Sequence, residues 1–342
     1  MQPMSLTLFP AGRARRRLLA LGALVAAAFA LLVLPRIAAA ANPAAVVSNS
    51  EAASAVHAKK VKTYWTPRRM RHATPLTAMP SRRDVAKAAA AAPAIDARGK
   101  VQTVPPTRGR ADNPLTKVPM ANLISNPSVY PYRTQGKVFF KSGGGSYVCS
   151  ATVVNTPTKR VVFTAGHCVV DEDVWSTNFA FVPGYKNGSK PYGTFVAAND
   201  SLYSLQGWAT AGNYSYDMAA AVLGGTRKVA EIVGSRGIKF NLARQQNFVS
   251  FGYPAGLPFN GQQLYSCPSP YKGQDPTTTN PRTQWINCNM TGGSSGGGWI
   301  VQGQYLNSVN SYGYNTQPGR MYGPYFGTGA QNLYNGVKSL AP

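Results

Sequence analysis

The sequence predicts an all-β fold, either a sandwich or a barrel, for the part of the chain from residue 121 to residue 342. Short apolar runs rich in Val, Phe, Tyr and Thr recur along these residues, and Gly, Pro and Asn separate them. Their number and spacing favour an all-β domain over alternating strands and helices. The predicted strands span residues 137–141, 147–154, 160–164, 179–182, 194–197, 218–223, 238–241, 248–253, 262–267, 283–288, 298–302, 305–309 and 321–326. A single helix over residues 330–340 is expected to close the chain.

Length and charge divide the chain into a basic first part and a larger second part. The 342 residues leave room for one large or two smaller domains. The net charge of +24 is uneven, because 19 Lys and Arg stand against 4 Asp and Glu up to Met120, and 16 against 7 after it. Most of the basic charge therefore lies outside the part that carries the motifs described below.

The first 41 residues have the pattern of a secretory signal peptide. Four arginines at positions 13, 15, 16 and 17 precede an apolar run over residues 18–34, and alanines occupy positions 38–41. This order predicts a signal peptide, export from the cell and cleavage near Ala41. A membrane anchor is the alternative, but a run of 17 residues that is largely alanine is short for a spanning helix. The Arg16 and Arg17 pair leaves the twin-arginine export route open.

Residues 42–120 form a basic segment rich in Ala and Pro. Because residues 42–117 show no sustained period, we expect this stretch to be disordered or loosely structured. Three interpretations remain open: a prosegment removed by cleavage at basic sites, a solvated linker, and an arm that binds anionic polymers or nucleic acid. His57 and His72 are expected to be incidental surface residues.

His167 is the candidate general base. It follows the predicted strand over residues 160–164 in the sequence Thr-Ala-Gly-His-Cys, which places an imidazole at a strand end. A lone histidine is more often structural, but Cys168 adjoins this one and Cys149 lies nineteen residues before Cys168. A bridge between the two cysteines would hold the imidazole in position, with about 3 kcal/mol of stabilisation from loop closure. A general base needs such positioning first.

Asp217 is the candidate partner of that histidine. The run of six apolar residues after it is expected to be buried, and a carboxylate at the mouth of such a strand is costly unless it is hydrogen-bonded. The Nδ1–H group of a histidine would satisfy it. Asp171, Glu172 and Asp173 lie too close to His167 and are expected in an exposed loop, and Asp200 is expected in a polar turn. A capping role for Asp217 in a turn is the alternative.

Ser295 is the candidate nucleophile, and Ser294 is its competitor. Both lie in the glycine-rich stretch over residues 291–298, between Cys288 and an apolar run. A flexible linker of this composition would have no reason to be matched by the histidine motif upstream. A nucleophile turn must present the hydroxyl to the base and direct two backbone N–H groups at the oxyanion. This favours Ser295, with its own N–H and that of Gly293 as donors.

These three motifs resemble the signature blocks of the chymotrypsin-fold serine peptidases, in the order His, Asp, Ser. The resemblance covers about residues 130–337, and the Phe-Gly-Tyr-Pro stretch over residues 251–254 is more similar to the bacterial glutamyl-endopeptidase branch. It implies two six-stranded antiparallel β-barrels, over about residues 125–230 and 231–342, with the catalytic triad between them. It also implies acyl transfer through Ser295, and Cys149–Cys168 matches the most widespread disulfide of that family.

Several positions depart from the pattern of that family. Ser294 stands where trypsin-type enzymes carry an aspartate that pairs with a new N-terminus. Asn289 stands where trypsin-type specificity would need an acid, and Asn310 stands where glutamyl peptidases carry a substrate-binding histidine. Together with Gly313, these two asparagines are the candidate residues of the substrate pocket, along an edge strand that an extended peptide could join.

The remaining predictions concern disulfides, partners and alternatives. The four cysteines contain no Cys-x-x-Cys pair, so two disulfides are expected, Cys149–Cys168 and Cys267–Cys288, and no metal or organic cofactor. The expected partners are polypeptide substrates of a monomeric, secreted enzyme, with no nucleic acid at the peptidase domain. A chymotrypsin-fold protein without turnover, which serves as a binding module at the cell surface, is the alternative. A second alternative gives the main role to the basic segment, as an anchor for acidic polymers.

Overall fold

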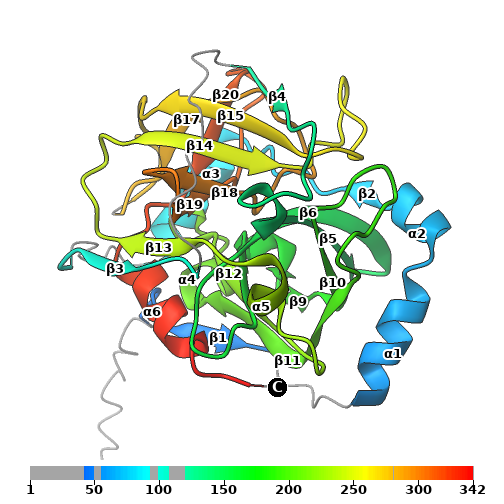
Figure 1. Cartoon of the computed structure of the whole chain (residues 1–342). Helices are drawn as coiled ribbons and strands as arrows, with labels where there is room; N and C mark the ends of the chain where they lie inside the picture. The colour runs from blue at the N-terminus through cyan, green and yellow to red at the C-terminus, as the bar shows by residue number, and fades with distance from the viewer. Residues whose placement is uncertain (1–41, 50–54, 93–98, 108–119, 280, 342) are drawn as a thin grey trace, which may run out of the picture. The chain divides into compact units, whose positions relative to one another are not determined.

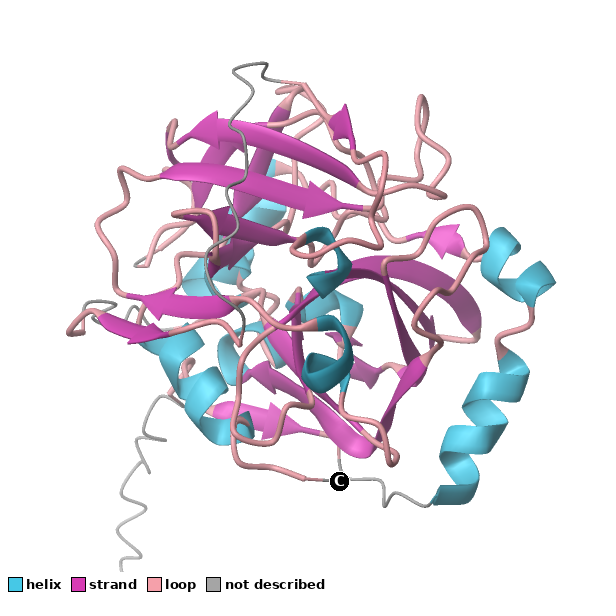
Figure 2. Cartoon of the chain, viewed as in Figure 1, coloured by secondary structure: helices cyan, strands magenta, loops and turns pink. Residues whose placement is uncertain are grey.

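The structure is a computed structural model that describes residues 42–49, 55–92, 99–107, 120–279 and 281–341. The chain divides into two units, Met1–Ala38 and Ala39–Pro342, and all described residues belong to the second. The predicted signal peptide therefore lies outside the described residues. Strands are the main regular structure of the described unit, and loops and short helices connect them (Figure 2). Within it, no helix is long and apolar enough to cross a membrane.

Six antiparallel strands close into a barrel, coloured green in Figure 1. They are β5 (Gln135–Ser142), β6 (Gly145–Val153), β7 (Val161–Thr164), β10 (Thr177–Pro183), β11 (Phe195–Leu205) and β12 (Ala219–Leu223). The order β11-β10-β5-β6-β7-β12 closes because β12 also pairs with β11.

The barrel is filled by alternate residues of its strands. Val138 and Phe140 of β5 belong to one buried apolar cluster, to which all six strands contribute, whereas Phe139 between them belongs to another. This is the alternation that a pleated strand imposes. The second cluster lies outside the barrel and also takes residues from the second half of the chain, such as Phe251 and Leu306. Both faces of the barrel strands are therefore buried, which explains their apolar sequences.

The second half forms two sheets joined through side chains. The seven-stranded sheet has the order β3-β13-β19-β18-β14-β15-β4, and the three-stranded sheet has the order β16-β17-β20. The bounds are β3 (Gln102–Val104), β4 (Asn122–Leu123), β13 (Gly237–Phe240), β14 (Asn247–Gly252), β15 (Tyr265–Pro270), β16 (Gly273–Gln274), β17 (Gln284–Asn287), β18 (Gly298–Val301), β19 (Tyr305–Val309) and β20 (Arg320–Gly323).

The prediction of a second closed, fully antiparallel barrel is wrong in two respects. Strands β13 and β19 pair in parallel, and no backbone ladder joins β15 to β17 among the described residues. The Cys267–Cys288 disulfide and a hydrogen bond from the Asn287 N–H to Ser269 Oγ hold these two strands together instead. Both predicted disulfides, this one and Cys149–Cys168, are confirmed.

Short elements connect these sheets. They are β8 (Val170–Asp171), β9 (Val174–Trp175), α4 (Gln206–Ala209), α5 (Val229–Val233), α6 (Thr328–Val337) and the 3₁₀ turns η1 (Tyr132–Thr134), η2 (Gly166–Cys168) and η3 (Tyr214–Tyr216). Helix α6 is the predicted closing helix, and it buries Leu333 and Val337 in the cluster outside the barrel. The prediction of a polar turn at Asp200 is wrong, because that residue lies within strand β11.

The prediction that residues 42–117 lack regular structure is wrong for the parts that the structure describes. They contain β1 (Val46–Ser48), α1 (Ala55–Tyr64), α2 (Pro67–His72), β2 (Thr74–Pro75), α3 (Arg82–Ala91) and β3. Strand β1 pairs with β11, and β3 pairs with β13, so the segment adds a strand to each half of the fold.

A few large apolar side chains attach this segment to the barrel. Val61 and Trp65 lie one helical turn apart and are fully buried in the cluster outside the barrel, as is Met70. The Trp65 indole lies 5.5 Å from the Phe139 ring, and its Nε1–H donates to the Asn178 carbonyl at 2.7 Å. These three side chains supply apolar burial that the average composition of the segment does not indicate. His72 is exposed, as expected.

Candidate active site

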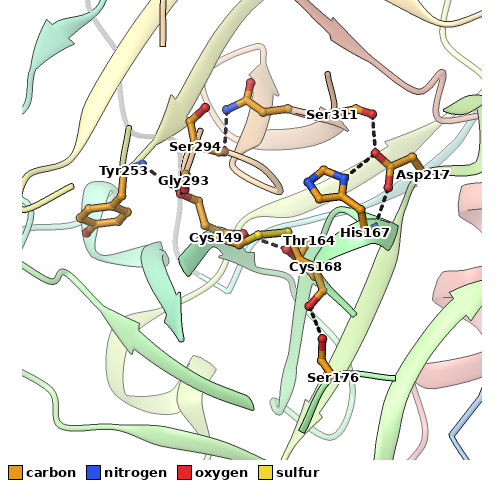
Figure 3. The surroundings of a disulfide bond; sticks show 12 residues. Cys149, Thr164, His167, Cys168, Ser176, Asp217, Tyr253, Gly293, Ser294 and Ser311 are labelled. Atoms are coloured by element: carbon orange, nitrogen blue, oxygen red, sulfur yellow. Dashed lines mark hydrogen bonds and ion pairs between the residues drawn. A yellow bond between two sulfur atoms is a disulfide. The ribbon is translucent and has the colours of Figure 1, made fainter. Parts of the chain in front are cut away.

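His167 lies in η2, the turn that follows strand β7, and its ring is buried. The Cys149–Cys168 disulfide ties this turn to strand β6. The His167 Nδ1 atom lies 2.9 Å from Asp217 Oδ2, and the backbone N–H of His167 donates to Asp217 Oδ1 at 2.8 Å (Figure 3). Because an ionised carboxylate only accepts, Nδ1 carries the proton and Nε2 presents its lone pair. Nε2 has no hydrogen-bond partner within the described chain.

Asp217 lies at the junction of η3 and strand β12, fully buried. Three groups donate to its carboxylate: the ring and the backbone N–H of His167, and the hydroxyl of Ser311 (Figure 3). These bonds compensate for the loss of water at a buried carboxylate. The structure therefore brings the two predicted residues together, and it adds Ser311 as a third member.

The pKa of His167 is raised above its ordinary value of 6.5. Burial by itself lowers this pKa, but the charge of Asp217, the hydrogen bond to it and the charge of Asp171 outweigh burial. Asp171 was predicted to be only an exposed loop residue. It is exposed and lies in strand β8, yet its charge acts on the imidazole.

We expect this raised pKa to appear in the pH dependence of activity. A protonated imidazole cannot act as a base, so the acid limb of kcat/KM should have its midpoint above pH 6.5. Asp171→Asn removes a negative charge that favours protonation, and should move the midpoint to lower pH. Asp173→Asn, in the same loop, is the matched control and should leave the midpoint in place. A midpoint that rises in Asp171→Asn would contradict this account.

The glycine-rich stretch forms a tight turn between strands β17 and β18, in which the two serines differ. The Ser294 hydroxyl donates to the Thr291 carbonyl at 2.7 Å and is thereby engaged inside the turn. No hydrogen bond engages the Ser295 hydroxyl within the described chain, and its backbone carbonyl accepts from the Ser150 N–H at 2.7 Å. Ser150 follows Cys149 directly, so the turn rests on the strand that is tied to the histidine turn. These contacts favour Ser295 over Ser294 as the reactive group.

Glycine is required at two positions of this turn. Gly293 has a φ of +91°, and a Cβ there would lie 2.8 Å from the Tyr253 carbonyl oxygen. Gly296 has a φ of +79°, and a Cβ there would lie 2.0 Å from Thr164 Oγ1. Both angles fall in the left-handed region that favours glycine. With this backbone, the Gly293 N–H donates to the Leu76 carbonyl at 2.9 Å, and the Ser150 hydroxyl donates to the Gly293 carbonyl at 2.9 Å.

A cavity of about 500 Å³ opens beside the turn. Ser294 and Ser295 line it, as do the predicted pocket residues Asn289 and Gly313. The Asn289 side chain also accepts a hydrogen bond from the Ala121 N–H at 2.8 Å.

The prediction that Asn310 lines the pocket is wrong. Its side chain is fully buried, and its Nδ2 group donates to the carbonyls of Phe251 and Ser294 at 2.9 and 3.0 Å. Its Oδ1 atom accepts from Ser250 and from the Trp299 indole, each at 2.7 Å. The bond to the Ser294 carbonyl means that the Asn310 side chain stabilises the glycine-rich turn. All polar atoms of this side chain are engaged in the interior, so none faces the cavity.

Sequence reasoning missed two residues that organise the site. Ser311, which donates to Asp217, lies between the pocket candidates Asn310 and Gly313 but was given no role. Ser150 was not considered, although its hydroxyl also accepts from the Tyr253 N–H at 2.9 Å. Their partners lie about a hundred residues away in the chain, so no local pattern marks them.

The sulfurs of Cys149 and Cys168 lie beside the His167 ring, and this group of residues has the composition of a metal site. The disulfide removes both thiolates, so these atoms do not form one.

Comparisons with known proteins identify relatives of this arrangement. Residues 131–311, more than half of the chain, match a family model described as "Lysyl endopeptidase, C-terminal domain". A comparison with curated proteins gives no match.

Solved structures of bacterial proteases are similar to the chain. The protease Anisep from Arthrobacter nicotinovorans is 46% identical with a TM-score of 0.58, over 62% of this chain and 99% of Anisep. The thermostable serine protease AL20 from an extremophilic microorganism is 42% identical with a TM-score of 0.57, over 60% of this chain and 97% of AL20. A Glu endopeptidase is 21% identical with a TM-score of 0.54, over 64% of this chain and 97% of that protein, and it shares the fold.

Proposed function

The chain belongs to the family of the lysyl endopeptidase C-terminal domain, and from this premise we propose that it is a secreted serine endopeptidase with Ser295 as its nucleophile. As a chymotrypsin-fold serine peptidase, it hydrolyses peptide bonds. The observation that carries the assignment of residues is the buried pair of His167 and Asp217, beside a turn that leaves the Ser295 hydroxyl unengaged.

In the proposed mechanism, His167 Nε2 takes the proton of the Ser295 hydroxyl as the oxygen attacks the substrate carbonyl. Asp217 keeps the ring in the tautomer with Nδ1–H and stabilises the imidazolium that forms. The N–H groups of Gly293 and Ser295 donate to the developing oxyanion, and each contributes about 3–4 kcal/mol to lowering the barrier. The imidazolium then protonates the leaving amine, and water releases the acyl-enzyme.

We propose that the cavity beside the turn receives the substrate side chain on the acyl side, with Asn289 and Gly313 in its wall. Within the described chain, no Asp or Glu lines this cavity, and Arg320 is its one charged residue. A lysine or arginine side chain would therefore find no counter-charge there. The proposed pocket differs in this respect from the specificity that the family description names.

Export and partners complete the proposal. Residues 1–41 would be removed as a signal peptide near Ala41, and the mature enzyme would act outside the cell as a monomer on polypeptides. A binding module without turnover is not favoured, because the relatives are named as proteases. A separate contact of the basic segment with anionic polymers is supported by helix α2, which exposes Arg68, Arg69 and Arg71. Binding by this face should weaken steeply as salt is raised.

Covalent labelling tests the assignment of the nucleophile. We expect a fluorophosphonate probe to modify one residue, Ser295, in the secreted protein after its N-terminal segment has been cut. Ser295→Ala should abolish labelling, whereas the matched variant Ser294→Ala should retain it, because that hydroxyl is engaged by the Thr291 carbonyl. Peptide mapping locates the adduct. Labelling of Ser294, or an unlabelled protein that is correctly folded, would contradict the proposal.

A further inference from the structure

The short stretch between helices α2 and α3 lies across the proposed active site. Strand β2 pairs with β6 in parallel (Figure 1), and the Leu76 N–H donates to the Val148 carbonyl at 3.2 Å. The chain then crosses to the other half of the fold, where the Gly293 N–H donates to the Leu76 carbonyl at 2.9 Å. Two residues later, the Gly313 N–H donates to the Ala78 carbonyl at 3.2 Å. Thr77, Ala78 and Met79 line the cavity beside Ser295.

We propose that residues 74–79 are a built-in inhibitor, which occupies the active site of the peptidase with its backbone reversed relative to a substrate. This inference rests on the proposed function. It adds a regulatory role for part of the basic segment, whose removal would activate the enzyme.

Occupation of the oxyanion hole is the first argument. Gly293 N–H is one of the two donors that the mechanism assigns to the oxyanion, and the Leu76 carbonyl engages it. The segment also lies directly against the turn, because a Cβ on Gly292 would be 1.8 Å from Thr77 Oγ1. A substrate carbonyl cannot reach the Gly293 N–H while these atoms are in place, so the segment and a substrate exclude each other.

Chain direction is the second argument, and it explains why the segment is an inhibitor. In the proposed reaction, the acyl-side residues of a substrate precede the carbonyl in the oxyanion hole and lie along the pocket edge at Gly313. Here Ala78, which contacts Gly313, follows Leu76, so the segment runs the opposite way.

The reversed direction also changes the position of the leaving group. If the Leu76–Thr77 bond were cleaved, the backbone nitrogen of Thr77 would have to leave. Thr77 is a residue that lines the cavity, whereas the Leu76 side chain packs against the cluster that contains the Cys149–Cys168 disulfide. In the reversed direction the nitrogen takes the place of an acyl-side group, away from the leaving-group side on which the proposed mechanism uses the His167 imidazolium. The Leu76–Thr77 bond should therefore resist cleavage.

Anchors on both sides keep the segment in place. Before it, α1 and α2 bury Trp65 and Met70 against the barrel. After it, Ser81 and Asp84 form a capping box at the start of α3, and Val85 packs against Tyr312 and Tyr322. Most hydrogen bonds of the segment at the site are made by its backbone. Because both of its ends are attached to the fold, its effective concentration at the site is high. Loosening either side should therefore release activity.

Two variants of the full chain test the inference after each has folded. Thr77→Trp puts a large side chain at the position whose hydroxyl already lies against Gly292, and should displace the segment. Thr63→Trp, on the exposed face of α1, is the matched control. The second variant carries an inserted recognition site for a specific protease between Pro80 and Ser81, so that one end of the segment can be freed by cutting the folded protein. The rates of fluorophosphonate labelling and of peptide hydrolysis are measured for each form.

We expect both rates to rise about tenfold or more in Thr77→Trp and after the cut, and to stay unchanged in Thr63→Trp. Mass spectrometry of the intact chain should find the Leu76–Thr77 bond whole while added peptides are cleaved. Equal rates in the intact, cut and Thr77→Trp forms would overturn the inhibitor but leave the peptidase standing. Rapid cleavage at Leu76–Thr77 would overturn the reversed direction. A lack of labelling in every folded form would overturn the peptidase, and the inhibitor with it.

Discussion

We expect His167→Ala to lower kcat by about a million-fold when the N-terminal segment has been cut. The proposed mechanism assigns the proton transfer to this buried ring, and removal of this member alone from a comparable triad costs nearly as much as removal of all three. Its Nδ1 bond to Asp217 would be lost as well. Single-turnover kinetics with an activated ester measure the effect, because they isolate acylation from product release.

Asp217→Asn and Ser311→Ala test the same site with smaller expected losses of kcat. The asparagine variant should lower kcat by about ten-thousand-fold, because an amide cannot hold the Nδ1–H tautomer. Ser311→Ala removes one of three donors to the carboxylate and should cost far less. All three proteins should melt cooperatively with the disulfides intact. If His167→Ala kept more than a tenth of the activity, another residue would be the base and the assignment would fail.

Trp65→Ala should lower the free energy of unfolding by about 3–5 kcal/mol, the range for loss of a large buried aromatic side chain. Trp65 is 2% exposed, contacts Phe139 of the barrel and satisfies the Asn178 carbonyl. Urea titration of the chain that retains residues 42–120 measures the loss.

Lys62→Ala on the same helix is the control for this variant. Lys62 is exposed, so its replacement should change the free energy of unfolding by about 0.5 kcal/mol or less. If Trp65→Ala unfolded at the same urea concentration as the parent protein, helix α1 would not be part of the cooperative unit. That result would also weaken the anchoring of the inhibitor segment.

The strands and the site differ in how far the sequence could predict them. Every predicted strand has a counterpart, because alternation of apolar residues and glycine turns are local signals. Strand β15 (Tyr265–Pro270) begins and ends three residues later than the predicted strand over residues 262–267. It includes two prolines, which are unfavourable within a sheet, so the prediction ended before them. The approach of His167 to Asp217 was predictable because each stands beside an apolar strand that barrel closure brings next to the other.

Long-range contacts account for what could not be predicted. The Asn310 side chain points into the interior because three elements converge on it, and its own neighbours in sequence give no sign of this. Apart from alanine, the basic segment has few apolar residues, so its average composition predicts disorder. The fold instead uses the positions of Val61, Trp65 and Val85, each of which packs into a buried apolar cluster with residues from later in the chain. Edge strands β1 and β3 likewise depend on ladders that the rest of the chain provides.

Those two edge strands have a consequence for the processed enzyme. Strand β1 satisfies the backbone of Tyr203–Leu205 in β11, and β3 satisfies that of Ile238–Phe240 in β13. If maturation takes both away, two rows of amide and carbonyl groups become open to any extended peptide, including one from a neighbouring copy. The amount of such self-association would then depend on enzyme concentration, and an uncut form would be protected from it because both edges stay paired.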